Sequence, residues 1–399
     1  MLRLRSALAA LRQRTESRRL LTPPAYFLLV LLLLIVGRTL PEDPLTTIRA
    51  ALFAPDFEAA HVQIILEQEQ RNLEPGGSYS PDSADVARLI TLTSESELLA
   101  RRSELVRYIW NDQGFPRRDP TLITENVVDS DFSSMDNLKS IDRLTVVMAH
   151  GVNSIVYLFH PLRDNGKLMI YHQGHRGGFV LGKGTIAYFL AKGYSVAALA
   201  MPLLGKNNQP IVDVPRVGRM RLHSHDHLRY LDTATFSSLR FFLEPIASLL
   251  HYVGQAYDFQ SVSMTGVSGG GWATTLYAAV DPRVTHSYPV AGTLPTYLSS
   301  EVEIGDYEEA LPEFYRIANY LELYLLGSHG VGRRQVQILN FYDPCCFGGV
   351  GYRTYEPALI QALAVLGPGS FEVYLDTSHH DHAISETAQL AIYGKENGR

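Results

Sequence analysis

Cysteine is scarce in this chain. The only two cysteines among 399 residues, Cys345 and Cys346, are adjacent. Neighbouring cysteines rarely form a stable bridge, because a disulfide strains the peptide bond between them. We therefore expect no disulfide framework and predict that both side chains are buried packing beneath the loop that follows Asp343. The cysteine count is compatible with a bacterial periplasm as well as with a cytosol.

An excess of basic charge is also missing. The chain has 41 acidic and 35 basic residues, a formal net charge of −6, and only 19% of its residues are charged. This balance gives no reason to expect a nucleic-acid partner. No internal repeat or low-complexity tract stands out, and 399 residues of which 46% are apolar suffice for one large core with appendages. The oligomeric state is left open.

The N-terminal 40 residues read as a membrane anchor. Residues 1–22 contain six arginines and one acid, Glu16, and an apolar run follows at 25–37. With residues 20–22 the run reaches about 18 residues, which is near the minimum for crossing a bilayer. A cleaved signal peptide is the alternative, but the chain lacks a small-residue cleavage site after the run. We predict a basic cytoplasmic tail at 1–22 and a signal anchor at 23–40, with the rest of the chain on the periplasmic or extracellular side.

Two helical patterns precede the main domain. Residues 57–73 and 84–110 have apolar residues at spacings of three and four, and Pro75-Gly76-Gly77 separates them. We assign residues 41–136 to a helical membrane-proximal region. The sequence does not decide whether these helices also pack on the domain that follows.

From residue 137 strands alternate with helices, which predicts an α/β domain over 137–399 with a mostly parallel sheet and flanking helices. Helices are expected at 186–190 and 228–252. The expected strands lie at 144–148, 154–159, 167–171, 194–200, 262–264, 284–290, 336–341 and 371–375. A helical insertion at 307–326, after the sixth strand, carries several aromatic residues. They could line a substrate pocket or simply pack between helices.

One stretch gives this pattern a chemical meaning. The short strand at 262–264 runs into Gly266-Val267-Ser268-Gly269-Gly270 and then into a helical pattern. This is G-x-S-x-G between a strand and a helix, a context in which the serine sits on a strained turn with its hydroxyl exposed. A glycine-rich loop with an incidental serine is the plain alternative. The stretch resembles the nucleophile elbow of the α/β-hydrolase superfamily, and the resemblance extends from about residue 141 to the C-terminus.

The resemblance implies a Ser-acid-His order along the chain. Ser268 would be the nucleophile. The acid is expected at the end of the next-to-last strand, where Asp343 precedes a proline; Asp306 is the fallback. The histidine is expected after the last strand, where His382 lies at a loop-to-helix junction and His380 is the alternative base.

Backbone N–H groups would form the oxyanion hole. The resemblance implies one donor at Gly269, directly after the nucleophile, and another in the loop after the third strand. That loop reads His172-Gln173-Gly174-His175, and the second donor is His175 or Gln173. The loop departs from the His-Gly motif of lipases and esterases because Gln173 stands between the histidine and the glycine.

Two histidine-rich stretches, 223–227 and 379–382, contain residue types that bind zinc. The first is one residue short of the metallo-β-lactamase-type motif, and the surrounding pattern does not follow that fold. We therefore predict no metal and no other cofactor. The stretch 223–227 is then a polar loop at the rim of the pocket.

These patterns predict a membrane-anchored serine hydrolase that cleaves a small-molecule or polymer ester through an acyl-enzyme on Ser268. Three alternatives stay open. An acyltransferase would use the same three residues, a catalytically inactive member would act as a membrane-tethered binding protein, and a metallohydrolase would use the histidine clusters.

Overall fold

The computed structural model describes residues 83–214, 217–298 and 306–398. The predicted anchor at 23–40 and the predicted helix at 57–73 lie outside these ranges. Within them, no helix combines the length and the apolar character that crossing a membrane requires. All described residues belong to one compact unit.

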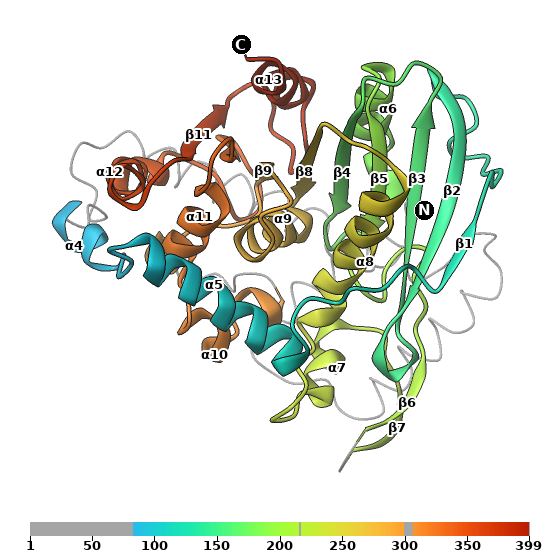
Figure 1. Ribbon diagram of the computed structural model, residues 1–399, viewed down its shortest axis with the longest axis horizontal. Coiled ribbons are helices and arrows are strands. Elements are labelled where there is room, and N and C mark those ends of the chain that lie inside the picture. The colour runs from blue at the N-terminus through green and yellow to red at the C-terminus, as the bar shows by residue number, and fades with distance from the viewer. Residues whose placement is uncertain (1–82, 215–216, 299–305, 399) are drawn as a thin grey trace, which may run out of the picture. The chain divides into compact units, whose positions relative to one another are not determined.

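The centre of this unit is a mixed, mostly parallel sheet of nine strands (Figure 1). Its order is β1-β2-β3-β5-β4-β8-β9-β10-β11. The first three pairings are antiparallel and the five from β5 to β11 are parallel. The strands are β1 (Leu122–Thr124), β2 (Leu138–Val147), β3 (Asn153–Pro161), β4 (Lys167–Gln173), β5 (Ser195–Ala200), β8 (Ser261–Val267), β9 (His286–Val290), β10 (Arg334–Asn340) and β11 (Ser370–Asp376).

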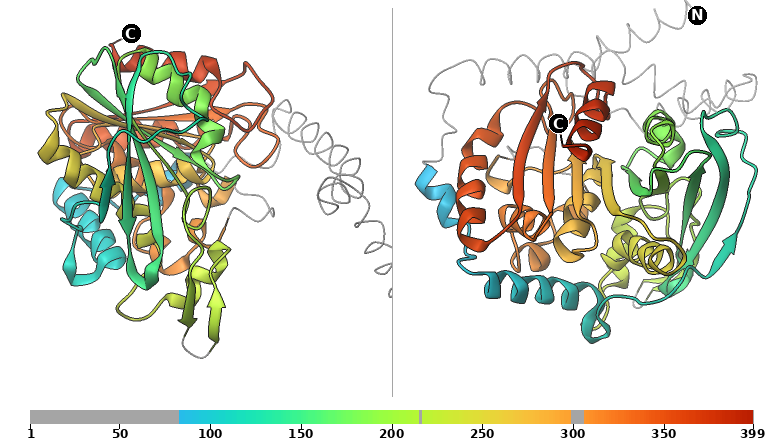
Figure 2. Two further views of the ribbon diagram at one scale, coloured as in Figure 1. Left: turned by 90° about the vertical axis from the view of Figure 1, so that its right-hand side faces the viewer. Right: turned by 45° about the horizontal axis from the view of Figure 1, so that its top comes forward.

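Helices cover both faces of this sheet (Figures 1 and 2). α6 (Lys183–Ala191) and α13 (Glu386–Glu396) pack on one face. The helices whose buried residues join the core of the other face are α4 (Ser83–Arg88), α5 (Glu95–Trp110), α7 (His225–Leu228), α8 (Arg240–Ala256), α9 (Gly269–Val280), α10 (Pro312–Tyr315), α11 (Tyr320–Ser328) and α12 (Glu356–Leu366). A separate hairpin joins β6 (Ile211–Val214) to β7 (Gly218–Arg221).

Each strand expected from the sequence overlaps a strand of the structure. The expected helices are more interrupted. The pattern over 84–110 divides into α4 and α5, because Ser94 accepts a hydrogen bond from the backbone N–H of Glu97 and caps a new helix. The pattern over 228–252 also divides, since α8 begins only at Arg240. The region 41–136, expected to be helical, also contributes β1.

α5 packs onto the sheet's helical layer. Leu98, Leu105 and Ile109 lie along one side of the helix and are fully buried. On the same helix, the Arg102 guanidinium donates hydrogen bonds to the carbonyl oxygens of Ala279 and Leu326, each at 2.9 Å. These carbonyls belong to the last turns of α9 and α11, so α5 binds backbone groups that those helices leave unpaired at their ends.

Between β9 and β10, the aromatic residues of the expected insertion are packing groups. Phe314 and Tyr324 are fully buried, and the Tyr315 hydroxyl accepts a hydrogen bond from Trp272 Nε1 at 2.6 Å. α11 is buried along its whole length and contacts α9.

Candidate active site

Ser268 stands between β8 and α9 in a strained conformation. Its φ is 58° and its ψ is −131°, a region that residues with a Cβ rarely occupy. Its N–H donates to Val290 O of β9 at 3.1 Å, and its carbonyl accepts the Trp272 N–H of α9 at 2.9 Å, so the adjacent strand and the following helix hold the turn. A Cβ at Gly270 would lie 2.0 Å from His172 O, which explains why the sequence needs glycine in this turn.

Asp343 and His382 come from the carboxyl ends of β10 and β11. His382 Nδ1 donates a hydrogen bond to Asp343 Oδ2 at 2.7 Å. The other carboxylate oxygen accepts the backbone N–H groups of Cys345 and Cys346 at 2.8 and 3.2 Å. The Asp343 carboxylate is thus fixed from both sides, and it fixes the tautomer of the ring with the proton on Nδ1.

This tautomer leaves His382 Nε2 as an acceptor. The side chain is 5% exposed, and Nε2 has no hydrogen-bond partner among the described residues. No hydrogen bond within the described ranges joins it to Ser268. Asn340 Nδ2 donates to Ala383 O at 3.0 Å, which ties the histidine loop to the end of β10.

The other candidates after β11 lie elsewhere. The His380 ring stacks on Tyr342 with centroids 4.2 Å apart, and the residue is exposed. His379 Nε2 lies 3.4 Å from Asp376 Oδ2. Asp343 therefore faces His382 and not His380. The fallback acid, Asp306, is not paired with either histidine.

The loop after β4 lies directly against the elbow. A Cβ at Gly174 would lie 2.4 Å from Val267 O and 2.7 Å from Ser268 Cβ. A Cβ at Gly269 would lie 2.4 Å from Cε1 of the His175 ring. The chain thus brings the predicted oxyanion donors, Gly269 and the Gln173–His175 loop, next to Ser268. Behind them His172 is fully buried, and burial lowers its pKa to about 4.

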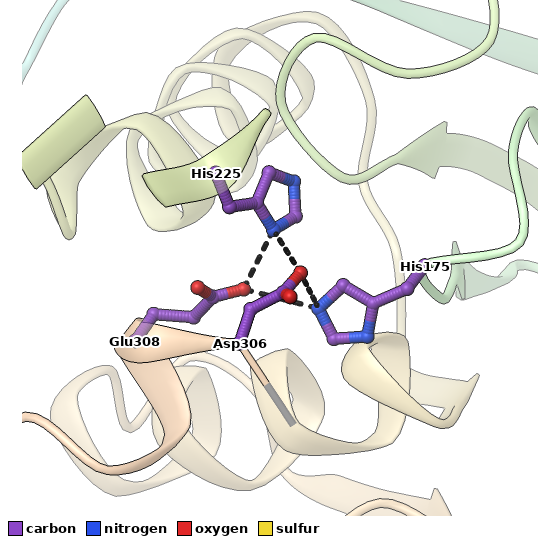
Figure 3. Close-up of side chains that lie close together, drawn as sticks. All are labelled: His175, His225, Asp306 and Glu308. Atoms are coloured by element: carbon purple, nitrogen blue, oxygen red, sulfur yellow. Dashed lines mark hydrogen bonds and ion pairs between the residues drawn. The ribbon is translucent and has the colours of Figure 1, made fainter. Parts of the chain in front are cut away.

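A second cluster beside the elbow was not predicted from the sequence. His175, His225, Asp306 and Glu308 point at one another (Figure 3). His225 Nδ1 lies 2.8 Å from Glu308 Oε1 and 2.9 Å from Asp306 Oδ2. His175 Nε2 lies 3.0 and 3.3 Å from the same two oxygens. Four ligand atoms from three separate segments therefore share one small space.

The electrostatics of this cluster are unusual. Burial works against the imidazolium of His225, but its hydrogen bonds to Asp306 and Glu308 raise its pKa to about 10. Burial alone would raise the pKa of Glu308, but the two rings lower it. Glu309, next in the chain, is buried beside these carboxylates, and its pKa is raised well above its ordinary value.

Two sequence expectations are wrong here. The stretch 223–227 is not simply a polar rim loop, because His225 lies in α7 with a side chain that is only 3% exposed. Cys345 and Cys346 are joined to each other, and Cys345 is exposed and not buried. Nothing in the sequence around Glu308 marked it as a candidate site residue. The only available hint was its spacing of two residues from Asp306, which is also the spacing of His223 and His225.

A groove of about 820 Å³ lies away from these residues. None of the candidate catalytic residues lines it. The groove is lined by the end of α5, the chain that follows it, the end of β2 and the start of α8. Its basic and aromatic lining residues are Trp110, Phe115, Arg117, Arg118 and Arg240.

No family model matches this chain, and no curated protein matches it. Solved structures resemble it at low identity. An acetyl xylan esterase from a Paenibacillus species is 16% identical, with a TM-score of 0.49 over 79% of this chain and 98% of that one. Acetyl xylan esterase 1 from a Thermoanaerobacterium species is 16% identical, with a TM-score of 0.48 over 78% and 96%. An esterase from Pyrococcus furiosus is 13% identical, with a TM-score of 0.41 over 70% and 94%. These identities are too low to assign an activity to this chain.

Proposed function

We propose that the protein is a serine hydrolase that cleaves a carboxylic ester. One observation carries the proposal. A serine at positive φ on a strand-to-helix turn shares the carboxyl edge of the parallel sheet with a hydrogen-bonded Asp343–His382 pair. A serine hydroxyl becomes a useful nucleophile only next to such a base.

In the proposed reaction, Ser268 Oγ attacks the ester carbonyl while His382 Nε2 takes its proton. The carbon–oxygen bond to the alcohol breaks, and the same nitrogen returns the proton to the leaving oxygen. Water then cleaves the acyl-enzyme by the reverse sequence of proton transfers. The unpartnered Nε2 supports this role, since catalytic hydrogen bonds often close only when substrate is present. Backbone N–H groups of Gly269 and His175 would bind the developing oxyanion.

A fluorophosphonate probe with intact-mass analysis tests the proposal, together with hydrolysis of short-chain nitrophenyl esters. We expect one label per chain that disappears in Ser268→Ala. In His382→Ala, kcat/KM should fall on the order of 10⁴–10⁶-fold. Asp343→Asn should lower it on the order of 10⁴-fold, because the wrong tautomer then faces the serine.

His380→Ala discriminates between the two candidate bases. We expect labelling to persist in this variant, because His380 stacks on Tyr342 and does not contact Asp343. Labelling that survives Ser268→Ala, or that is lost in His380→Ala and kept in His382→Ala, would contradict the assignment. No labelling of the folded wild type would favour a binding protein.

We also propose that residues 23–40 anchor this domain on the non-cytoplasmic side of a membrane. The basic segment before the apolar run supports that orientation. Protease accessibility in intact cells and spheroplasts tests the side. The intact mass of the membrane-bound protein tells an uncleaved anchor from a cleaved signal peptide.

A further inference from the structure

The cluster of His175, His225, Asp306 and Glu308 is a set of metal-ligand atoms with a common centre. The four atoms lie within 4.8 Å of one another, and they come from the loop after β4, from α7 and from the chain before α10 (Figure 3). The His225 side chain is 3% exposed and Glu308 is fully buried, so half of the set is enclosed in the interior. Asp306 is 46% exposed and opens the cluster to solvent.

We propose that these four side chains bind a divalent transition-metal ion of the zinc class. Two imidazoles and two carboxylates are a ligand set typical of such ions. Bonds of about 2.0–2.1 Å in a tetrahedron place neighbouring ligand atoms roughly 3.3–3.4 Å apart. The four nitrogen–oxygen distances run from 2.8 to 3.3 Å, so these four pairs need to lengthen by at most about 0.6 Å, and all four ligand atoms lie within 4.8 Å of one another.

The outer contacts of both rings fit this role. His225 Nε2 donates to Pro202 O at 3.1 Å, which directs Nδ1 at the centre. On the other ring, His175 Nδ1 faces Glu309 Oε1 at 3.9 Å while Nε2 faces the centre. Metal-binding histidines commonly have a carbonyl or carboxylate behind the second nitrogen, which sets the tautomer and the ring orientation.

Simple hydrogen bonding explains less of this arrangement. A ring N–H donates one well-aligned hydrogen bond. Here each of the two ring nitrogens faces both Glu308 Oε1 and Asp306 Oδ2. The cluster therefore has four close nitrogen–oxygen contacts, whereas two N–H groups would need only two. A divalent cation can take the place of the His225 proton between the two carboxylates. The ring then binds the ion as neutral imidazole, and the charge of the buried carboxylates is still offset.

The ion would act at a distance from the reacting atoms. The His175 ring lies against Gly269, so a metal that fixes this ring also fixes the loop beside Ser268. The side chain of His175 and the 306–309 segment would then position the loop, whose backbone N–H groups are the ones proposed to contact the substrate. The site does not depend on the proposed esterase activity, because a protein with an inert serine could hold the same ion.

Cobalt is the probe for the test. The full-length protein is treated with a chelator, freed of it, and titrated with Co²⁺ in the visible absorption range, followed by competition with Zn²⁺. We expect one equivalent of Co²⁺ with an intense four-coordinate spectrum that one equivalent of Zn²⁺ abolishes. Zn²⁺ should also raise the melting temperature of the chelator-treated protein, because it binds the folded state.

Variants locate the binding. Glu308→Gln should weaken Co²⁺ binding by more than the roughly 10–100-fold that loss of an outer partner costs. Asp306→Ala should weaken it as well, and this variant changes a half-exposed side chain, so it tests the site even if Glu308→Gln does not fold. His223→Gln and His227→Gln are matched controls from the same stretch, whose rings contact each other and lie outside the cluster.

A second candidate set, Asp343, Cys345 and His382, is tested by His382→Ala, which should keep the cobalt spectrum. The proposal is overturned if the wild type binds no cobalt with the spectrum of a four-coordinate site. It is equally overturned if binding survives Asp306→Ala and Glu308→Gln, or is lost in His382→Ala or in the two histidine controls.

Discussion

Gly174→Ala is a sharp test of how the loop after β4 serves Ser268. A methyl group at this position would lie 2.4 Å from Val267 O, 2.7 Å from Ser268 Cβ and 3.2 Å from Gly269 N. Real Cβ atoms do not approach closer than 3.0 Å, so the loop and the elbow must separate by at least 0.6 Å, the difference between 3.0 and 2.4 Å. The obstructing atoms belong to the turn itself and cannot rotate away.

This separation occurs between the nucleophile and the loop proposed to donate to the oxyanion. Misplacement of reacting groups by about 1 Å costs on the order of 100-fold in rate, so we expect kcat/KM to fall about 10–100-fold. Overpacking should also lower the free energy of unfolding by about 1–3 kcal/mol. Ester hydrolysis and urea denaturation measure the two effects.

Gly184→Ala is the matched control for this substitution. Gly184 lies within α6, and a Cβ there would meet no atom within 4 Å. The change should raise the free energy of unfolding by up to about 1 kcal/mol, since alanine favours the helix, with activity unchanged. Unchanged activity in Gly174→Ala would refute the reasoning. Equal loss of activity in both variants would refute it too.

Two further predictions concern stability. Burial raises the pKa of Glu396, but the ion pair with His286 and two hydroxyl hydrogen bonds lower it below its ordinary value of 4.5. The stability that this carboxylate contributes is therefore present above pH 4.5 and is lost as the pH falls. Glu396→Gln should have a lower free energy of unfolding than the wild type at pH 7, and its free energy of unfolding should decline less in acid. Urea titrations from pH 3 to 7 measure this, and an equal decline of the free energy of unfolding with falling pH in variant and wild type would contradict it. Arg102→Met should lower the free energy of unfolding by about 1–3 kcal/mol, because two backbone carbonyls lose a charged donor. The exposed Arg107→Met on the same helix should have little effect, and equal losses in the two variants would point to helix propensity instead.

The sequence predicted those features that depend on neighbouring residues. The strands of the sheet and the turn at Ser268 follow from alternation, glycine spacing and a helical pattern within about twenty residues. The choice of Asp343 and His382 followed from the resemblance to the α/β-hydrolase superfamily, which implies a Ser-acid-His order with the acid and the histidine after the last two strands. The catalytic roles of these residues remain predictions for the labelling experiment.

The second cluster could not be predicted in this way. His225 and Glu308 are 83 residues apart and come from segments that read as a polar loop and as a helix. Their meeting depends on how α7 and the chain before α10 fold over the elbow, which no local pattern encodes. The break between α4 and α5 was missed for a different reason. Apolar spacing continues through Ser94, and the start of a new helix there depends on hydrogen bonds between residues 93–94 and Glu97.

The docking of α5 has a practical consequence for dissecting the protein. A shortened chain that began at residue 137, where strand and helix alternation starts, would lack Leu98, Leu105 and Ile109 and would uncover the apolar surface beneath them. It would also leave the end of α9 without the Arg102 guanidinium, while the other end of that helix carries Ser268. The smallest part of this protein that can be expected to fold with an intact nucleophile turn therefore includes α5.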